Sequence, residues 1–327
     1  MRVGLTYDLR SAYLMEGFTE EETAEFDRES TVEAIENALR ALGYQTDRIG
    51  HVRDLARRLS SGDRWEMVFN ICEGMYGVGR EAQVPALLDA WNIPYTFSDS
   101  MVLALTLHKG MTKHVARDCG VPTTDFAVVE DPEDIGKVVL PYPLFVKPVA
   151  EGTGKGIDAR SRVDRPEELE SLCRSLLPQY PLGLIVETYL PGREFTVGIV
   201  GTGSKTRSLG VLEVALNESA EAHSYGYVNK EECEDRVTYR LTEGEIARKC
   251  EEVAVKAWRC LNCRDAGRVD LRLDARGEPQ FMEVNPLAGL HPEHSDLPIL
   301  CHLKGIPYLR LMEMIMDSAK MRLPHEK

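Results

Sequence analysis

The segment 267–290 reads GRVDLRLDARGEPQFMEVNPLAGL and carries the clearest structural pattern in the chain. In residues 268–273 charged side chains alternate with Val and Leu, which is the two-residue period of a β-strand with one apolar face. A second strand-like run, 280–285, follows after Arg276 and Gly277. We therefore expect an antiparallel hairpin in which Arg276 and Gly277 form a two-residue loop.

The register of this hairpin places two acidic side chains opposite each other. With the two-residue loop, Asp270 faces Glu283, and Arg268 faces Asn285. Opposed carboxylates repel each other unless a cation lies between them, and carboxylate and amide oxygens are ligands suited to Mg²⁺. The pattern predicts a magnesium site of Asp270, Glu283 and Asn285 with Arg268 beside it. A solvated strand face with incidental charges is the alternative, and a three-residue loop would change the register and weaken the argument.

Composition limits the class of protein. The chain has 327 residues, a length typical of two or three domains, and its 43% hydrophobic and 28% charged residues are ordinary for a soluble globular protein. Acidic residues outnumber basic ones by 53 to 39, which gives a formal charge of −14. Such a field repels phosphate backbones, so we expect no nucleic-acid partner and a small-molecule ligand instead.

Targeting signals are also lacking in the sequence. No apolar run approaches the roughly 20 residues that cross a bilayer, and the first ten residues do not resemble a secretory signal. The eight cysteines are too scattered for a disulfide framework. We expect a cytoplasmic protein with no membrane partner.

The order of helical and strand-like segments predicts an α/β (α+β) protein. Residues 1–95 alternate short apolar runs with helical patterns, as in a parallel sheet with crossover helices. Ser30 with Glu33, and Thr242 with Glu245, have the spacing of capping boxes. Residues 99–119 are expected to be helical, and residues 219–235 to form a long loop. We divide the chain into the domains 1–98, 99–190 and 191–327.

Magnesium held by carboxylates usually serves a polyphosphate, so phosphate-binding groups are expected nearby. The loop 151–156, EGTGKG, offers backbone N–H groups, Thr153 and Lys155, either as a phosphate cradle or as a mobile hairpin tip. Lys109 and Lys147 are further candidates, although Lys147 alone is equally explained as a solvated strand residue. Neither a Walker A motif nor a dinucleotide-binding fingerprint is present.

Four segments together resemble the D-alanine:D-alanine ligase family within the ATP-grasp superfamily. They are LFVKPVAEGTGKGI (144–157), LIVETYLPGREFTVGIV (184–200), the hairpin 267–290, and His-Ser at 294 and 295. The resemblance spans about residues 99–305. It implies a three-domain ATP-grasp fold in which ATP lies between two antiparallel sheets and a parallel α/β domain comes first.

The resemblance also implies roles for individual residues. Asp270, Glu283 and Asn285 would bind two Mg²⁺ (or Mn²⁺), Arg268 and the N–H of Gly289 would stabilise a tetrahedral intermediate, and Ser295 would meet a substrate carboxylate. The glycine loop would act as a lid. The implied ATP-binding residues are Lys109, Lys147, Glu151, Thr153, Gly154, Lys155, Glu187, Tyr189, Leu190 and Glu194.

The N-terminal part departs from the family pattern. Family members begin with a Gly-Gly-x-Ser-x-Glu segment, whereas this chain reads TYDLRSAYLMEGFTEEETAEFDRES, where Glu25 takes the place of the family glutamate by position. Glu81 matches a second acidic contact, and Lys230 aligns with a family lysine. Glu231 follows it where the family has an aromatic residue associated with the choice of the second amino acid. The identity of the two substrates therefore stays open.

The function implied is an ATP- and Mg²⁺-dependent carboxylate–amine ligase. It would join two amino acids through an acyl phosphate, as in the dipeptide synthesis that serves peptidoglycan, and a homodimer is possible. An ATP-binding regulator or inactive paralogue that lacks ligase activity is the first alternative. A phosphotransferase that stops at a phosphorylated acceptor is the second.

Overall fold

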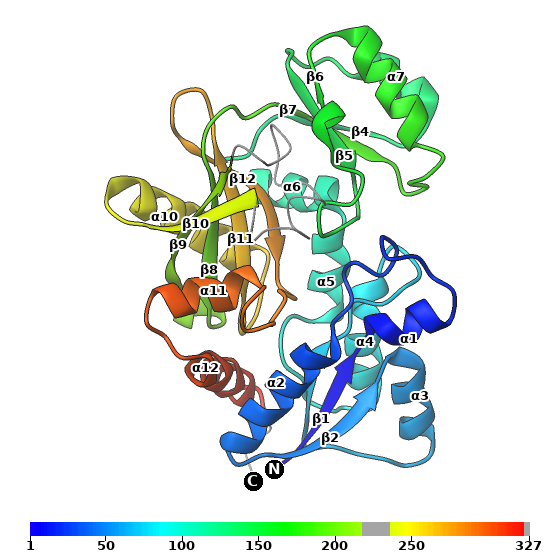
Figure 1. The fold of residues 1–327 in the computed structure, drawn as a ribbon, viewed down its shortest axis with the longest axis vertical. Coiled ribbons are helices and arrows are strands. Elements are labelled where there is room, and N and C mark those ends of the chain that lie inside the picture. The colour runs from blue at the N-terminus through cyan, green and yellow to red at the C-terminus, as the bar shows by residue number, and fades with distance from the viewer. Residues whose placement is uncertain (218–235, 324–327) are drawn as a thin grey trace.

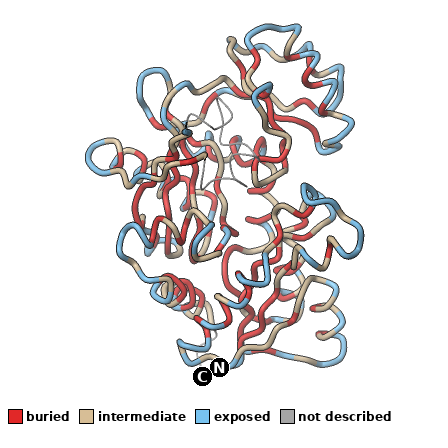
Figure 2. The backbone as a smooth tube through the Cα atoms, in the orientation of Figure 1, coloured by how far each residue is buried: buried red, intermediate tan, exposed pale blue. Residues whose placement is uncertain are grey.

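The computed structural model describes residues 1–217 and 236–323, and these form three sheets with their helices (Figure 1). The strand orders are β2-β1-β3, β4-β7-β5-β6 and β10-β9-β8-β11-β12. Buried positions follow the strands of all three sheets and the helix faces that pack on them (Figure 2). In the described ranges, no helix combines the length and the apolar character needed to span a membrane.

The first sheet is parallel, as the sequence predicts for residues 1–95. Val3, Leu5 and Phe69 are fully buried in its strands, and Ile35 and Leu39 cover them from one helix. The elements are β1 (Arg2–Tyr7), α1 (Arg10–Met15), α2 (Glu29–Ala41), β2 (Gln45–Gly50), α3 (Val52–Ser60), β3 (Met67–Ile71) and α4 (Gln83–Ala90).

The second sheet is antiparallel and has its own helix and core. Two helices that precede it along the chain connect it to the first sheet (Figure 1). The elements are α5 (Ser100–Leu107), α6 (Lys109–Asp118), β4 (Phe126–Val129), β5 (Leu144–Pro148), β6 (Arg162–Val163), α7 (Pro166–Leu176) and β7 (Leu184–Thr188).

The third sheet is also antiparallel, and one long helix covers a face of it. Trp258 and Ala254 of that helix are fully buried with Phe195, Leu271 and Phe281 of the strands. The elements are β8 (Glu194–Val200), β9 (Arg207–Leu216), β10 (Val237–Thr242), α10 (Glu245–Cys260), β11 (Ala266–Leu273), β12 (Pro279–Asn285), α11 (Asp296–Leu303) and α12 (Tyr308–Lys320).

The hairpin of β11 and β12 confirms the predicted pairs but not the predicted loop. Asp270 pairs with Glu283 and Arg268 with Asn285, whereas Leu273 pairs with Pro279. The connection is therefore one residue longer than the expected two-residue loop, and Gly277 occupies its left-handed position with φ 80°. An irregularity in the ladder directly after Asp270 absorbs the extra residue and restores the register of the acidic pair.

Two other local predictions are wrong. Neither capping box forms, because α2 is capped at Arg28 and α10 at Gly244 without a side-chain hydrogen bond. The segment 99–119 is helical as predicted, but it is divided into two helices because His108 leaves the helical conformation and its Nδ1 accepts a hydrogen bond from the Met111 N–H. This break places Lys109 at the first residue of α6. The predicted loop 219–235 lies outside the described residues.

Candidate functional site

Two adjoining cavities contain almost all of the site residues suggested by the sequence. The wide cavity has a volume of about 480 Å³ and is lined by segments near all three sheets. The narrow cavity, about 70 Å³, lies between the second and third sheets. The residues that line both are Lys109, Glu151, Gly152, Arg268 and Glu283. The two cavities therefore meet at a group of charged side chains.

A buried carboxylate, Glu187, lines the narrow cavity together with Lys147 and is paired with two lysines. Lys147 of β5 places its Nζ 3.1 Å from Glu187 Oε2 of β7, and Lys113 of α6 forms an ion pair with the other oxygen of Glu187. All three side chains are buried. Burial alone would raise the pKa of Glu187, but the two ammonium groups overcome it and hold the pKa below its usual range. Lys147 is therefore held in place and is not a solvated strand residue.

Lys109 brings a second ammonium group to the junction of the cavities. Its Nζ donates a hydrogen bond to the backbone oxygen of Glu151 and lies 3.7 Å from Glu283 Oε2, while Lys147 lies 3.9 Å from the same oxygen. Burial lowers the pKa of Lys109, and the nearby Lys147 lowers it further. Two lysines thus converge on one carboxylate of the predicted magnesium pair, where a polyphosphate could replace part of that contact.

The far end of the narrow cavity is formed by the β7–β8 connection. Tyr189 and Leu190 line it together with Glu194 of β8. Arg272 lies 3.6 Å from Glu194 Oε2, and its guanidinium carbon is 5.2 Å from the centre of the Tyr189 ring. An aromatic ring, an aliphatic side chain and a carboxylate that could accept hydroxyl hydrogen bonds suit a nucleoside.

Asp270 is tied to the side chains around it on three strands. Its Oδ1 accepts a hydrogen bond of 2.8 Å from Thr196 on β8, and its Oδ2 accepts one of 3.1 Å from Asn285 on β12. Oδ2 also forms an ion pair with Arg268. The side chain is thereby fixed in the orientation that the hairpin register predicts.

The oxygen atoms that the hairpin offers suit one kind of Mg²⁺ site. Across residues 1–217 and 236–323, no group of three or more His, Cys, Asp and Glu side chains could hold an ion. Asp270 and Glu283 are paired across the strands, with the Asn285 amide beside them. Two carboxylates suit an ion that takes its remaining ligands from phosphate oxygens and water, which is the usual manner in which proteins bind Mg²⁺. The residues therefore suit an Mg²⁺ ion that is also bound by the phosphates of a ligand. They do not suit a site in which the protein supplies every metal ligand.

Arg268 and Ser295 both line the wide cavity. The Arg268 guanidinium forms ion pairs with Asp270 and, at 3.7 Å, with Asp296. Burial would lower its pKa, but these carboxylates raise it above its usual range, so Arg268 stays charged. A side chain on Gly289 would come within 2.8 Å of Ser295 Oγ, which shows how closely the 289 backbone approaches Ser295. Arg268 and Ser295 therefore offer this cavity a cationic group and a hydroxyl group.

The wide cavity also has three acidic side chains. Asp27, Glu73 and Glu81 line it. Burial raises the pKa of Glu81 to about 7, and burial together with Asp8 raises that of Asp27 to about 7. Burial, with Glu81 next, raises the pKa of Glu73 well above its usual range. A cavity lined by both cationic and acidic groups suits a zwitterionic ligand such as an amino acid.

Two predicted substrate residues need separate mention. Glu25 lines the wide cavity, but its carboxylate accepts hydrogen bonds from Arg80 and from the Gly152 N–H. Its predicted contact with a substrate ammonium group stays a prediction. Lys230 and the neighbouring Glu231 lie outside the described residues.

The glycine loop 151–156 separates the two cavities. Thr153 lines the wide cavity and Gly154 lines the narrow one. Thr153 and Gly154 have φ of 53° and 75°, and for Thr this left-handed conformation is strained. The loop therefore borders both the predicted phosphate position and the predicted amino-acid position.

Comparison with known proteins agrees with this geometry. A family model described as D-ala D-ala ligase C-terminus matches residues 115–317. A D-alanine–D-alanine ligase of Thermotoga petrophila is 32% identical over 314 residues, which cover 95% of this chain and 97% of that protein. The chain belongs to the D-alanine–D-alanine ligase family. The resemblance found in the sequence is thus confirmed.

Solved structures of D-alanine–D-alanine ligase family members share the fold. The D-alanine–D-alanine ligase from Bacillus anthracis complexed with ATP has a TM-score of 0.70 at 20% identity, with 98% of both chains covered. VanG D-Ala:D-Ser ligase from Enterococcus faecalis has a TM-score of 0.74 at 17% identity, with 97% of this chain and 99% of that chain covered. These likenesses confirm the expected ATP-grasp fold.

Sequence reasoning missed two cations of the site. Lys113 follows Lys109 by one helical turn, and this i, i+4 spacing on one face was the available signal. Arg80 directly precedes Glu81, and its guanidinium makes the contacts with Glu25 described above. Neither residue has a local pattern that predicts its burial, because the partners lie far away in the sequence.

Proposed function

We propose that the protein is an ATP- and Mg²⁺-dependent ligase that joins two amino acids through an amide bond. The observation that carries this proposal is the meeting of the two cavities at Lys109, Arg268 and Glu283. A nucleoside triphosphate in the narrow cavity would direct its terminal phosphate toward this junction. An amino-acid carboxylate in the wide cavity would reach the same point from the other side.

The lysines and the carboxylates prepare the phosphate position. Lys109 and Lys147 would contact phosphate oxygens and offset the charge on the transferring phosphoryl group. Asp270, Glu283 and Asn285 would hold Mg²⁺, which would supply further charge neutralisation at those oxygens. The backbone N–H groups of the 151–156 loop would cover the phosphates.

Amide formation then requires two steps at the carboxylate of the first amino acid. Phosphoryl transfer from ATP to a carboxylate oxygen gives an acyl phosphate and ADP, and the amine of the second amino acid attacks its carbonyl carbon. The tetrahedral oxyanion would accept hydrogen bonds from Arg268 and the Gly289 N–H. Collapse of the intermediate expels inorganic phosphate, and the attacking nitrogen loses its proton, which leaves the amide.

The polar side chains that line the wide cavity would bind the charged groups of the substrates. We assign Ser295 to a substrate carboxylate and Glu81 to a substrate ammonium group. Glu25 has the family position for a second ammonium contact, but its two carboxylate oxygens accept hydrogen bonds from Arg80 and the Gly152 N–H, so the ammonium assignment rests on Glu81. Lys230 would contact the substrates from its segment. A D-Ala:D-Ser ligase has the same fold, so the fold does not determine which amino acids are joined.

We further propose that the three sheets correspond to functional domains with boundaries 1–98, 99–190 and 191–327. The nucleotide would lie between the second and third of these. We place the reaction in the cytoplasm, where ATP and free amino acids are available, and a homodimer is a possible assembly.

The test is turnover of ATP with a panel of D- and L-amino acids, with ADP and the new amide measured together. The proposal requires ADP release that depends on amino acid and Mg²⁺, with dipeptide formed. ATP binding without product over the whole panel would instead indicate a regulator or inactive paralogue. A phosphorylated amino acid that accumulates without amide would indicate a phosphotransferase.

A further inference from the structure

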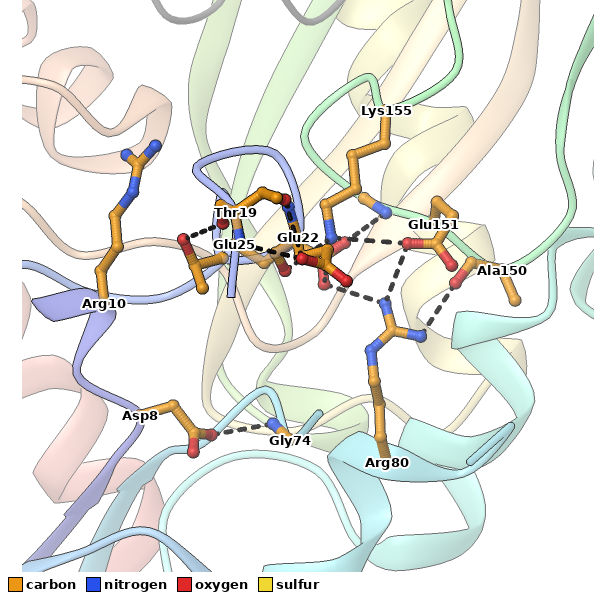
Figure 3. A network of polar contacts seen from close by, with 12 residues as sticks. Asp8, Arg10, Thr19, Glu22, Glu25, Gly74, Arg80, Ala150, Glu151 and Lys155 are labelled. Atoms are coloured by element: carbon orange, nitrogen blue, oxygen red, sulfur yellow. Dashed lines mark hydrogen bonds and ion pairs between the residues drawn. The ribbon is translucent and has the colours of Figure 1, made fainter. Parts of the chain in front are cut away.

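A network of charges joins the N-terminal segment to the glycine loop (Figure 3). Arg80 donates a hydrogen bond of 2.9 Å to Glu25 Oε2 and another of 3.0 Å to the backbone oxygen of Ala150. The other oxygen of Glu25 accepts a hydrogen bond from the Gly152 N–H. Arg80 and Glu25 together therefore hold the backbone at the start of the loop from both sides.

A second cation extends the network along the loop. Lys155 Nζ lies 3.5 Å from Glu151 and 3.9 Å from Glu25, and it donates a hydrogen bond of 3.3 Å to the backbone oxygen of Glu22. Arg80 also lies 3.9 Å from Glu151. Two cations thus alternate with two carboxylates, with one of each contributed by the loop.

The contact between Arg80 and Glu25 is buried. Their side chains are 7% and 8% exposed. Burial would raise the pKa of Glu25, but Arg80 and Lys155 hold it below its usual range, so the carboxylate stays ionised. Removing one member of a buried ion pair leaves the other charge without compensation, so such a contact holds its parts in one arrangement.

The loop sequence is shaped for this contact. A side chain at Gly152 would place its Cβ 2.6 Å from Glu25 Oε1, which is closer than the atoms can approach. Glycine at 152 therefore allows the Glu25 carboxylate to reach the backbone N–H. The residues after it, Thr153 and Gly154, line the wide and the narrow cavity respectively.

We propose that Arg80 and Glu25 are positioning residues that latch the glycine loop over the reaction site. This inference rests on the proposed ligase function. The latch touches neither reacting atom; it acts through the backbone of residues 150–152. Its consequence concerns water, which can attack the acyl phosphate carbonyl and return the carboxylate and inorganic phosphate. A latched loop keeps water out, so that each ATP consumed yields one amide.

The first experiment measures coupling, the ratio of ADP released to amide formed. In Arg80→Ala and Glu25→Gln we expect this ratio to rise several-fold above that of the wild type, because the loop opens during the lifetime of the intermediate. Glu25→Gln is nearly isosteric and keeps an acceptor for the Gly152 N–H, so it tests the charge without a cavity. Arg80→Lys should recover part of the coupling. An unchanged ratio in both Arg80→Ala and Glu25→Gln would overturn the proposal.

The second experiment does not depend on catalysis. Trypsin cuts after Lys155 only when the loop leaves its closed position, and mass spectrometry of the fragments gives the rate. We expect faster cleavage there in Arg80→Ala and Glu25→Gln than in the wild type, with no nucleotide added. Arg57→Ala is the matched control, because Arg57 is a 72% exposed arginine of the same N-terminal unit, and within residues 1–217 and 236–323 its side chain forms an ion pair with Asp54 alone.

The two experiments separate the latch from the ligase function. If the wild type forms no amide, the proposed function fails, and cleavage at Lys155 still tests the latch. Equal cleavage in the wild type, the two latch variants and the control would overturn the latch. Faster cleavage in the latch variants alone would support it.

Discussion

Replacing Arg268 by Ala removes one of the two groups that we assign to the oxyanion, the other being the Gly289 N–H. Loss of one such donor costs about 10²- to 10³-fold in kcat, or roughly 3–4 kcal/mol of transition-state stabilisation. The same substitution has a structural effect, because Arg268 forms ion pairs with Asp270 and Asp296, whose side chains are each 9% exposed. Breaking buried pairs of this kind costs about 3–5 kcal/mol of the free energy of unfolding.

These two effects can be separated by measurement. Urea unfolding at fixed Mg²⁺ gives the fraction of Arg268→Ala that is folded, and initial rates of ADP and amide formation are then expressed per folded molecule. Arg268→Lys is the matched control, because it keeps a charge for Asp270 and Asp296 but lacks the planar fork of donors. We expect it to recover stability more than turnover. Near-normal turnover in folded Arg268→Ala would refute the assignment of Arg268 to the oxyanion.

Three further predictions test other parts of the site. Asp270→Asn keeps the side-chain volume and removes the charge. Mg²⁺-dependent ADP release should therefore fall by about 10²-fold and require a higher Mg²⁺ concentration. An unchanged Mg²⁺ titration would argue against Asp270 as a metal ligand. Asp27 has a pKa raised from 3.8 to about 7, so the folded protein binds more protons than the unfolded chain between those values and loses stability as the pH rises through them. Asp27→Asn should therefore stabilise the protein at pH 8 but not at pH 3, as judged by urea unfolding; equal effects at both would contradict this. Lys113→Met removes one of the two lysines that pair with Glu187 and leaves Lys147 as its partner. We expect a higher KM for ATP and a loss of about 3–5 kcal/mol in the free energy of unfolding. An unchanged KM would show that Lys113 does not affect nucleotide binding in the narrow cavity.

The acidic pair of the hairpin could be predicted from sequence, but for a reason that is only partly local. The two-residue period fixes which side chains share a face, and the assumed two-residue loop then placed Asp270 opposite Glu283, as observed. The loop is one residue longer than predicted, and the ladder irregularity after Asp270 corrects the register. A bulge of this kind is not specified by local sequence, so the right pairing was reached through a wrong loop.

Local signals failed where distant contacts decide the structure. Ser30 has the spacing of a capping residue, yet its hydroxyl lies 3.2 Å from Nε2 of His291, which is 261 residues away. Lys113 and Arg80 were not predicted as site residues, because the burial of a charged side chain can be predicted only when its ion-pair partner is known. Those partners, Glu187 and Glu25, come from other segments of the chain.

The charged side chains of the site are paired with one another within the protein. Lys147 and Lys113 are held by Glu187, Arg268 by Asp270 and Asp296, and the loop by Arg80 with Glu25. Groups fixed in this way need little reorganisation when phosphate charge develops, and fixed dipoles and charges are the largest source of catalytic stabilisation in many enzymes. These pairs reduce the free energy gained on folding, because each buried charge loses its contact with water. Turnover should therefore fall when a residue that holds a catalytic group in place is removed, as readily as when the catalytic group itself is removed. Lys113→Met and Arg80→Ala are the substitutions that isolate this effect.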